Sequence, residues 1–187
     1  VEYLVNLADS VIKIDSDIRF VVIGEGKEWE NVYDLAHKKG LLNMNFFIFR
    51  SLPKTKLRPW LNTSDIHIAL MKGPELYVKN AVNNKFFDAL AVGKPIINNF
   101  IGWQSNIAND ENVGFNIASN NIVKAANQLV DKLNDKTWLQ NASENAYKLA
   151  KERFSRDKLA KELEEILKKV VDQHLELYQK TLEQSNL

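Results

Sequence analysis

One stretch of the chain, "NNKFFDALAVGKPIINNF" at positions 83–100, holds the residues whose chemistry is most suggestive. Its pattern predicts a helix that ends at Gly93 and a strand that follows. Asp88 lies one to two turns into this helix, where a carboxylate can accept two hydrogen bonds from a vicinal diol such as a ribose. The free N–H groups of the helix start, placed between Lys79 and Asn84, form an anion site. The stretch therefore predicts a nucleotide pocket, and the alternative is that Asp88 is a solvated helix residue.

The sequence "GEGKEW" offers a second kind of chemistry. Gly24 and Gly26 follow an apolar run and precede a helical pattern, as in the fingerprint of dinucleotide-binding proteins. That fingerprint needs a third glycine at position 29, and this chain has Trp29 there. An NAD-binding site is therefore disfavoured. A tight strand-to-helix turn explains the two glycines, and a small nest of N–H groups for an anion is the alternative.

The three histidines do not support nucleophilic or metal chemistry. His37 and His174 belong to predicted helices, and His67 alternates with Ile66 and Ile68 in a predicted strand. No two histidines have metal-ligand spacing on one helix face, and the sequence holds neither a GxSxG nor a GxxxxGK[ST] motif. His67 is therefore predicted to be a core or sheet-edge residue, and no metal and no cofactor is expected.

The elements that position these residues alternate between strand and helix. Apolar runs closed by turn residues predict strands at 18–24, 45–51, 65–70, 94–100 and 113–118. Helical patterns fill the intervals, at 27–40, 54–64 and 79–92 among others, and dominate after Asn121. This alternation indicates an α/β protein with a Rossmann-like, mostly parallel sheet and helices on both faces. The loop "MKGPELYVKN" leaves the third strand at the carboxyl edge, where such sheets bind ligands.

Composition limits the class of protein further. The chain has 187 residues, 45% of them hydrophobic and 26% charged, as in a soluble globular protein. Its net charge of +1 argues against nucleic acid as a partner. There is no cysteine, which fits a reducing cytoplasm, and no apolar run approaches the ~20 residues of a membrane span. Val1 lies inside a helical pattern, so the chain is expected to be cut from a longer protein.

Four blocks of the sequence resemble a known family in their order and spacing. They are "FVVIGEG" (20–26), "NFFIFRSLPKTKLRPWLNTSDIHIAL" (45–70), "NNKFFDALAVGKPIINNF" (83–100) and "ENVGFNIA" (111–118). Together they are similar to the C-terminal, nucleotide-sugar-binding half of a GT-B glycosyltransferase, and the third block is the most specific. The resemblance covers about residues 1–155. It points to the retaining bacterial transferases that build capsules, lipopolysaccharide and glycolipids.

The resemblance implies roles for residues around the third block. Asp88 takes the place of the acid that binds the donor ribose, where the family usually has Glu. Asn80 takes the place of a first acid that approaches the transferred sugar, so it is the candidate catalytic residue although it departs from the motif. The backbone amides expected at the diphosphate are those of Val82, Asn83 and Asn84, with Lys85 beside them.

Further donor contacts are implied away from that block. The base is expected against the loop after the second predicted strand, near Arg50, Ser51 and Leu52. Gly24 is expected to contact the donor from the turn after the first predicted strand. Trp103 is expected near the donor sugar or the cleft between domains. The family also carries an Arg and a Lys that neutralise the diphosphate, on a loop expected to precede this chain.

These inferences combine into one expectation. Residues 1–154 form the nucleotide-sugar-binding domain of a retaining, metal-independent glycosyltransferase, without its first strand, and residues 155–187 form a helical extension. The acceptor, a saccharide or lipid-linked saccharide of surface polysaccharide synthesis, enters from an N-terminal domain outside this chain. The protein is expected in the cytoplasm or at the inner face of the plasma membrane, and the fragment alone is expected to transfer no sugar. The alternatives are a nucleotide-sugar epimerase on the same fold and a non-catalytic interaction module.

The C-terminal tail carries a separate expectation. From Ser155 to about Lys180 the pattern predicts one helix, with Ser155 as its N-cap. Its apolar stripe consists of Leu159, Leu163, Ile166, Leu167, Val170, His174, Leu175 and Tyr178. In the resembling family the final helix packs on the N-terminal domain, so part of the stripe is expected to be exposed here. Self-association through residues 163–182 is therefore predicted.

Overall fold

The computed structural model describes residues 2–185, and within the last helix it describes side chains as far as Leu175, together with Tyr178. Val1, expected in the first helix, lies outside these residues. The helices are α1 (Glu2–Val11), α2 (Trp29–Lys38), α3 (Lys54–Thr63), α4 (Glu75–Asn80), α5 (Asn84–Ala91), α6 (Trp103–Asp110), α7 (Ile122–Asn134), α8 (Lys136–Glu152) and α9 (Arg156–Ser185). The strands are β1 (Phe20–Ile23), β2 (Phe46–Phe49), β3 (His67–Ala69), β4 (Ile96–Asn98) and β5 (Gly114–Asn116).

The strands are parallel, as the alternation of strands and helices predicts. Phe20 of β1 lies opposite Phe46 of β2, and Ile96 of β4 lies between His67 of β3 and Gly114 of β5. The ladders form two groups, β1–β2 and β3–β4–β5, rather than the one continuous sheet that was expected. Within residues 2–185 no ladder joins β1 to β3, so side-chain packing connects the two groups instead.

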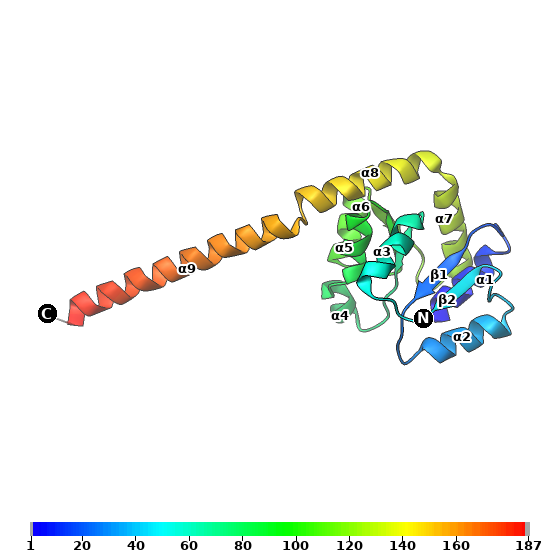
Figure 1. Ribbon diagram of the computed structural model, residues 1–187, viewed down its shortest axis with the longest axis horizontal. Helices are drawn as coiled ribbons and strands as arrows, with labels where there is room; N and C mark the ends of the chain where they lie inside the picture. Colours follow the sequence, from blue (N-terminus) through cyan, green and yellow to red (C-terminus); the bar gives the residue numbers. More distant parts are fainter. Residues whose placement is uncertain (1, 186–187) are drawn as a thin grey trace.

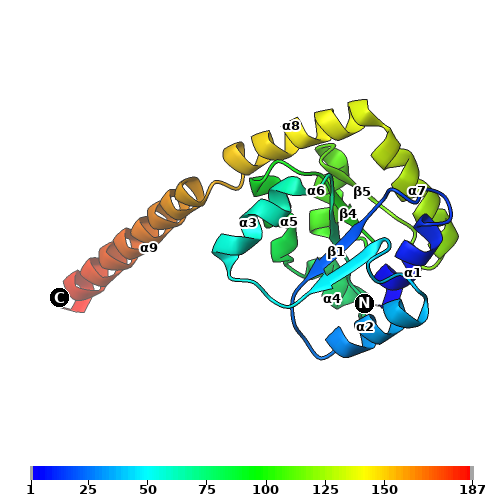
Figure 2. The same ribbon diagram turned by 45° about the vertical axis from the view of Figure 1, so that its right-hand side comes forward.

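Two hydrophobic clusters cover the faces of the β3–β4–β5 group. The first gathers residues of α1, α2, α7 and the β1–β2 pair, and Ile97 of β4 belongs to it. The second gathers residues of α5, α6 and α8, and Ile96 of β4 belongs to that one. Because neighbouring residues of a strand point to opposite faces, β4 is buried on both sides. Helices therefore cover both faces of this sheet, as predicted (Figure 2).

Glycines end two of the helices where the sequence predicts an end. Gly40 after α2 and Gly93 after α5 both have positive φ, 69° and 64°. After α5, the amide of Gly93 donates to the carbonyl of Leu90 at 3.0 Å, and that of Lys94 to the carbonyl of Ala89 at 3.0 Å. This is the Schellman arrangement, which needs a residue that tolerates the left-handed region. It turns the chain from α5 directly into β4.

The helix predicted over 79–92 is in fact two helices. α4 ends at Asn80, the backbone is extended at Ala81 and Asn83, and α5 begins at Asn84. The side chain of Asn83 caps α5 by accepting a hydrogen bond from the amide of Lys85 at 3.0 Å. A capping residue with extended dihedrals starts a new helix, so the anion site expected between Lys79 and Asn84 shifts to the start of α5.

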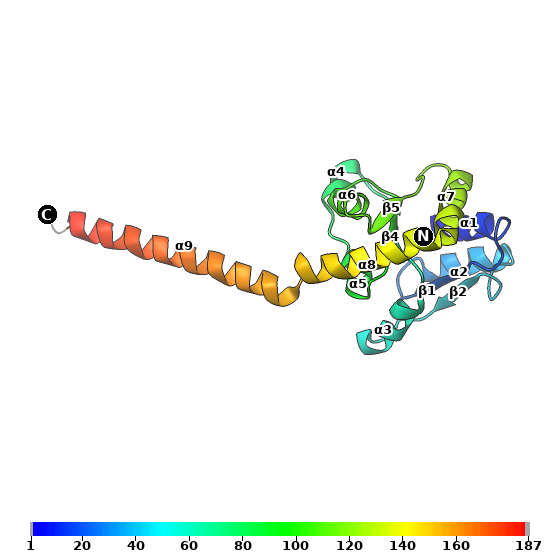
Figure 3. The ribbon, with the colours of Figure 1, turned by 90° about the horizontal axis from the view of Figure 1, so that it is seen from above.

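The chain after Asn121 is helical, as predicted, with breaks at Asp135 and at 153–155. α7 and α8 pack against the compact body, whereas α9 projects away from it as an arm (Figures 1 and 3). Side chains from Asp157 to Leu175 are all exposed. No helix in the described part of the chain is long and apolar enough to cross a membrane.

Candidate functional site

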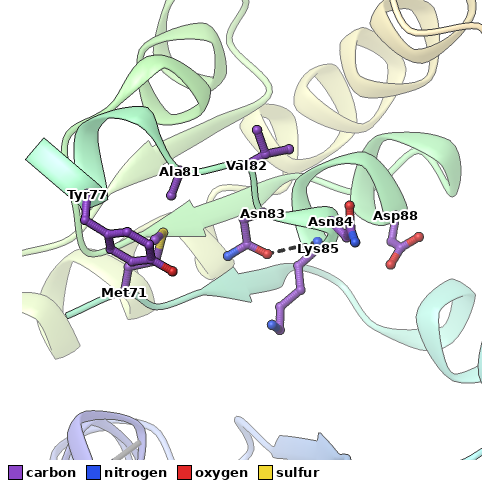
Figure 4. Close-up of a pocket in the computed structure, with 8 residues that line it drawn as sticks. All are labelled: Met71, Tyr77, Ala81, Val82, Asn83, Asn84, Lys85 and Asp88. Carbon is purple, nitrogen blue, oxygen red and sulfur yellow. Dashed lines mark hydrogen bonds between the residues drawn. The ribbon is translucent and has the colours of Figure 1, made fainter. Parts of the chain in front are cut away.

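An open cavity of about 500 Å³ lies beside the α4–α5 junction (Figure 4). It is lined by Met71, Tyr77, Ala81, Val82, Asn83, Asn84, Lys85 and Asp88. Met71 follows β3 at its carboxyl end, which is the edge where parallel sheets bind ligands. Tyr77 and Met71 lie at one end of the cavity and Asp88 at the other, with the N-terminus of α5 between them. The cavity therefore joins a helix start and a carboxylate, as the sequence predicts.

The backbone between α4 and α5 presents two amides that no other group uses. The amide of Ala81 donates to the carbonyl of Tyr77, and that of Asn83 donates to Gln104 Oε1 at 2.8 Å. Within residues 2–185 the amides of Val82 and Asn84 have no hydrogen-bond partner. Both residues line the cavity. Unpaired amides at a helix start attract anions, because the helix dipole adds to their own partial charge.

Two side chains at the start of α6 hold this junction in place. Gln104 accepts from the amide of Asn83 and donates to the carbonyl of the same residue at 3.1 Å, while Trp103 Nε1 donates to the carbonyl of Ala81 at 3.0 Å. Gln104 is only 1% exposed. Gly102 lets α6 come this close, because a Cβ there would lie 3.0 Å from the carbonyl oxygens of Val78 and Lys79. The geometry of the anion site thus depends on α6 as well as on α5.

Gln104 was not predicted as a site residue. Its role depends on the extended conformation of Ala81 and Asn83, which the helical pattern of the sequence conceals. The detectable signal is local: a glycine followed by two residues with side-chain donors, at the point where a predicted strand becomes a helix.

Asp88 lies on the same side of α5 as the free amides and is half-buried. Its carboxylate accepts no hydrogen bond from any residue between 2 and 185. His67 of β3 lies near Asp88. Burial has the largest influence on the pKa of the His67 imidazole and lowers it. Smaller influences come from Lys94, which also lowers this pKa, and from Asp88, which raises it. His67 Nε2 donates to the carbonyl of Leu61 at 3.1 Å, and this hydrogen bond raises the pKa of the ring by less than burial lowers it. His67 is therefore a partly buried strand residue, as predicted, and the carboxylate of Asp88 remains available to a ligand.

Residues 1–149 match the model of a protein family described as glycosyl transferases group 1. The chain belongs to this family. No curated protein sequence is similar enough to the chain to count as a match.

Solved structures of other proteins share the fold of this chain. A mutant of S. aureus TarM, solved with fondaparinux, α-GlcNAc-glycerol and UDP, has a TM-score of 0.70 at 18% identity over 86% of this chain. Anabaena HepE in complex with UDP has a TM-score of 0.71 at 17% identity over 88% of the chain. The chain spans 31% of the TarM chain and 44% of the HepE chain.

A third structure is itself a single domain. The C-terminal domain of LpcC, a glycosyl transferase group 1 family protein of Francisella tularensis, has a TM-score of 0.65 at 18% identity. The match covers 83% of this chain and 79% of that domain. The predicted fold, one half of a GT-B glycosyltransferase with a long last helix, is therefore confirmed.

The resemblance also implies donor or catalytic roles for Asn80 and Trp103, and both side chains make hydrogen bonds within the chain. The side-chain Nδ2 of Asn80 donates back to the carbonyl of Leu76 at 2.8 Å, within α4. Trp103 is half-buried, and its indole N–H is engaged by Ala81. Neither residue lines the cavity that contains Asp88.

Arg50 and Gly24 lie together at the carboxyl ends of β1 and β2. The amide of Gly24 donates to the carbonyl of Phe49 at 3.1 Å. Arg50 stacks over the ring of Trp29 at 3.6 Å and pairs with Glu30 at 2.9 Å. Ser51 is exposed and Leu52 half-buried on the loop that follows. A Cβ on Gly24 or Gly26 would meet nothing within 4 Å, so the chain's own packing does not require these glycines.

Among the residues that the structure describes, no three His, Asp or Glu side chains come together as potential metal ligands.

Replacing Gln104 with methionine is expected to destabilise the chain by about 1–3 kcal/mol, because it leaves the amide and carbonyl of Asn83 without partners. Methionine keeps the length of the side chain but has no donor. Urea unfolding measures the change. Asn106→Met, at an exposed position of the same helix, is the matched control and should change stability by less than about 0.5 kcal/mol. Equal stabilities of the two variants would show that Gln104 does not hold the junction.

Proposed function

We propose that residues 1–154 form the donor-binding domain of a retaining glycosyltransferase, and that residues 155–187 are a helical extension of it. The observation that carries the proposal is the cavity beside α5, where two unpaired amides and an unpaired carboxylate lie on one side of a single helix. The amides of Val82 and Asn84 bind the diphosphate of a nucleotide sugar, and Asp88 accepts hydrogen bonds from its ribose hydroxyls. Lys85, exposed at the same helix start, adds a positive charge.

Other donor contacts in this proposal come from the edge formed by β1 and β2. The base lies against residues 50–52, and the space beside Gly24 admits a close approach of the ligand. Arg50 is already stacked on Trp29, so the chain presents a flat surface at that edge. The donor sugar lies toward Trp103. Asn80 contacts this sugar only if its side-chain amide releases the carbonyl of Leu76. HepE and TarM, whose structures contain UDP, support a nucleotide diphosphate as the ligand class.

The proposed mechanism is electrostatic. The amides and the dipole of α5 stabilise the negative charge that develops on the departing nucleoside diphosphate, without a metal ion. The acceptor is a saccharide or lipid-linked saccharide of surface polysaccharide synthesis, used in the cytoplasm or at the inner face of the plasma membrane. Since the chain spans 44% of HepE, it is expected to bind donor by itself but to transfer no sugar.

Asp88→Ala is expected to weaken the binding of UDP by about 1.5–3 kcal/mol, the range for a hydrogen bond to a charged group. Calorimetry with UDP, GDP and ADP identifies the preferred base and measures this loss. Asp110→Ala, at an exposed acid on α6, is the control and should bind like the parent.

The ribose contact has a sharper test in the 2′-deoxy form of the preferred nucleotide. The parent should lose affinity when the 2′-hydroxyl is removed, whereas Asp88→Ala should be almost insensitive to its removal. An equal loss in both proteins would place the ribose away from Asp88. The absence of binding by every nucleoside diphosphate would overturn the donor-binding proposal as a whole.

A further inference from the structure

A second cavity lies at the other edge of the sheet from the cavity beside α5. Its volume is about 320 Å³, at the lower end of the range of ~300–1,000 Å³ that is typical of small-molecule sites. Asn112, which lines it, comes just before β5, so this cavity lies at the amino end of that strand. Its other described lining residues belong to the N-terminal part of α8, and they are Trp138, Asn141, Ala142, Glu144 and Asn145. The two cavities share no residue.

This second cavity is distant from the surfaces on which the resembling family packs its N-terminal domain. Those surfaces are the final helix and the cleft expected beside Trp103, which follows β4 at its carboxyl end. Trp138 lies near the start of α8, and α9 follows the opposite end of α8 (Figure 1). From Trp138 to Glu152 the helix is about 21 Å long at 1.5 Å per residue. A domain packed on α9 and on the carboxyl edge of the sheet would therefore leave the second cavity open.

The polar lining of the second cavity consists mainly of asparagine amides. Within residues 2–185 the side chains of Asn112, Asn141 and Asn145 make no hydrogen bond with the chain itself. Asn141 and Asn145 lie four residues apart, on one face of α8, and Asn112 reaches the cavity from the turn before β5. A primary amide both donates and accepts hydrogen bonds, as a hydroxyl group does. The three amides therefore suit a ligand that carries several hydroxyl groups.

An aromatic ring forms the apolar part of the lining. Trp138 is half-buried, and Phe115 meets its ring edge-on with 5.4 Å between centroids. Lys132 Nζ lies 4.8 Å from the centroid of the same ring, and the backbone amide of Trp138 donates to the carboxylate of Asp135 at 2.9 Å. These contacts orient the ring before a ligand arrives. A sugar ring combines an apolar C–H face, which can pack on an aromatic side chain, with hydroxyl groups that can reach the amides.

The charge of the lining disfavours anionic ligands. Glu144 is the only ionisable group among the described lining residues, and its carboxylate accepts a hydrogen bond from Gln140 at 3.1 Å. No lysine or arginine of the described part of the chain lines the second cavity. A phosphate or an acidic sugar would therefore meet a negative charge without a basic partner, whereas a neutral sugar would not.

We propose that the second cavity is a binding site for a neutral saccharide. One sugar ring packs its C–H face on Trp138, and its hydroxyl groups exchange hydrogen bonds with the amides of Asn112, Asn141 and Asn145. The site binds the saccharide without reacting with it, and it holds the saccharide at the edge of the sheet away from Asp88. This proposal does not depend on donor binding, because the two cavities have separate linings.

A titration followed by nuclear magnetic resonance tests the saccharide site. Isotope-labelled full chain is titrated with maltotriose, triacetylchitotriose and isomaltotriose, and at least one of them should shift the signals of Asn141, Asn145 and the Trp138 indole in a saturable way. Combining Asn141→Ala with Asn145→Ala should weaken this binding about tenfold. Alanine favours helix, so the double variant should fold. Asn127→Ala removes an exposed amide from α7 and is the matched control, which should bind like the parent.

Asp88→Ala and UDP distinguish the second cavity from the cavity beside α5. Asp88→Ala should bind the saccharide as the parent does, and an excess of UDP should not displace the saccharide. The absence of saturable shifts with all three saccharides would overturn the proposal. Unchanged affinity in the double asparagine variant, or displacement of the saccharide by UDP, would overturn it as well.

Discussion

Replacing Gly114 with alanine is expected to destabilise the chain by at least about 3 kcal/mol, because the new methyl group has no space. A Cβ at this position would overlap the carbonyl oxygen of Ile96 and lie 3.0 Å from its carbonyl carbon. Both atoms belong to the backbone of β4, which is buried on both faces and cannot yield. β5 would have to separate from β4 and lose the parallel ladder between them. Urea unfolding, or the soluble yield if the variant does not fold, measures the effect.

Gly26→Ala is the matched control for this substitution. A Cβ at Gly26 would meet nothing within 4 Å, and the residue does not have a positive φ. The stability of Gly26→Ala should therefore stay within about 0.5 kcal/mol of the parent. If Gly114→Ala unfolds at the same urea concentration as Gly26→Ala, the close approach of β5 to β4 is wrong.

The strands and the helix ends were predictable because short-range chemistry determines them. Each observed strand lies inside a predicted apolar run, and β4, which is buried on both faces, has the most continuous burial of the five. Gly40 and Gly93 end their helices because only a residue that tolerates positive φ completes those turns. The separation of the strands into two hydrogen-bonded groups was not predictable, because apolar runs do not say which strands are neighbours.

The break between α4 and α5 escaped prediction for a different reason. The segment "YVKNAVNNKFF" contains neither glycine nor proline, and its pattern is compatible with one helix. Asn83 starts the second helix through its own side chain, and Gln104 holds Asn83 from a helix that comes twenty residues later. Tertiary contacts of this kind override local propensity, and they have no periodic signature.

The candidate site was predictable in part. The sequence placed Val82, Asn84 and Asp88 together because they share one helix start, and all three line the cavity. It could not tell which amides are free, since that depends on the hydrogen bonds of Gln104. The family resemblance also implies that Arg50 and Gly24 contact the donor. Whether that edge and the cavity bind one ligand stays a prediction that nucleotide binding must test.

α5 belongs to the core and to the site, which explains why one helix carries large apolar residues and a carboxylate. Phe86, Ala89 and Leu90 are buried on one face, whereas Asn84 and Asp88 line the cavity on another. Asn83 at the start and Gly93 at the end determine where α5 begins and ends. The burial of one face of α5 then determines the direction in which its free amides and the Asp88 carboxylate point.

Phe86→Ala should therefore damage stability and binding together. Phe86 is 1% exposed, and its ring meets those of Trp103 and Phe154 edge-on at 6.3 and 5.9 Å between centroids. Removing a buried ring of this size is expected to cost about 3–5 kcal/mol in unfolding free energy. Because Trp103 also holds the carbonyl of Ala81, the cavity left behind lets the junction beside α5 shift. The affinity for UDP should then fall even where the variant is still folded.

Phe86→Leu separates the two consequences. It fills most of the space, so it should cost clearly less than alanine and retain most of the UDP affinity. Urea unfolding with and without UDP measures both quantities, because a ligand that binds only the folded chain raises its stability by an amount set by its affinity. If Phe86→Ala binds UDP as the parent does while losing stability, the packing of α5 does not position the site. If it loses neither, Phe86 is not the residue that joins this helix to the core.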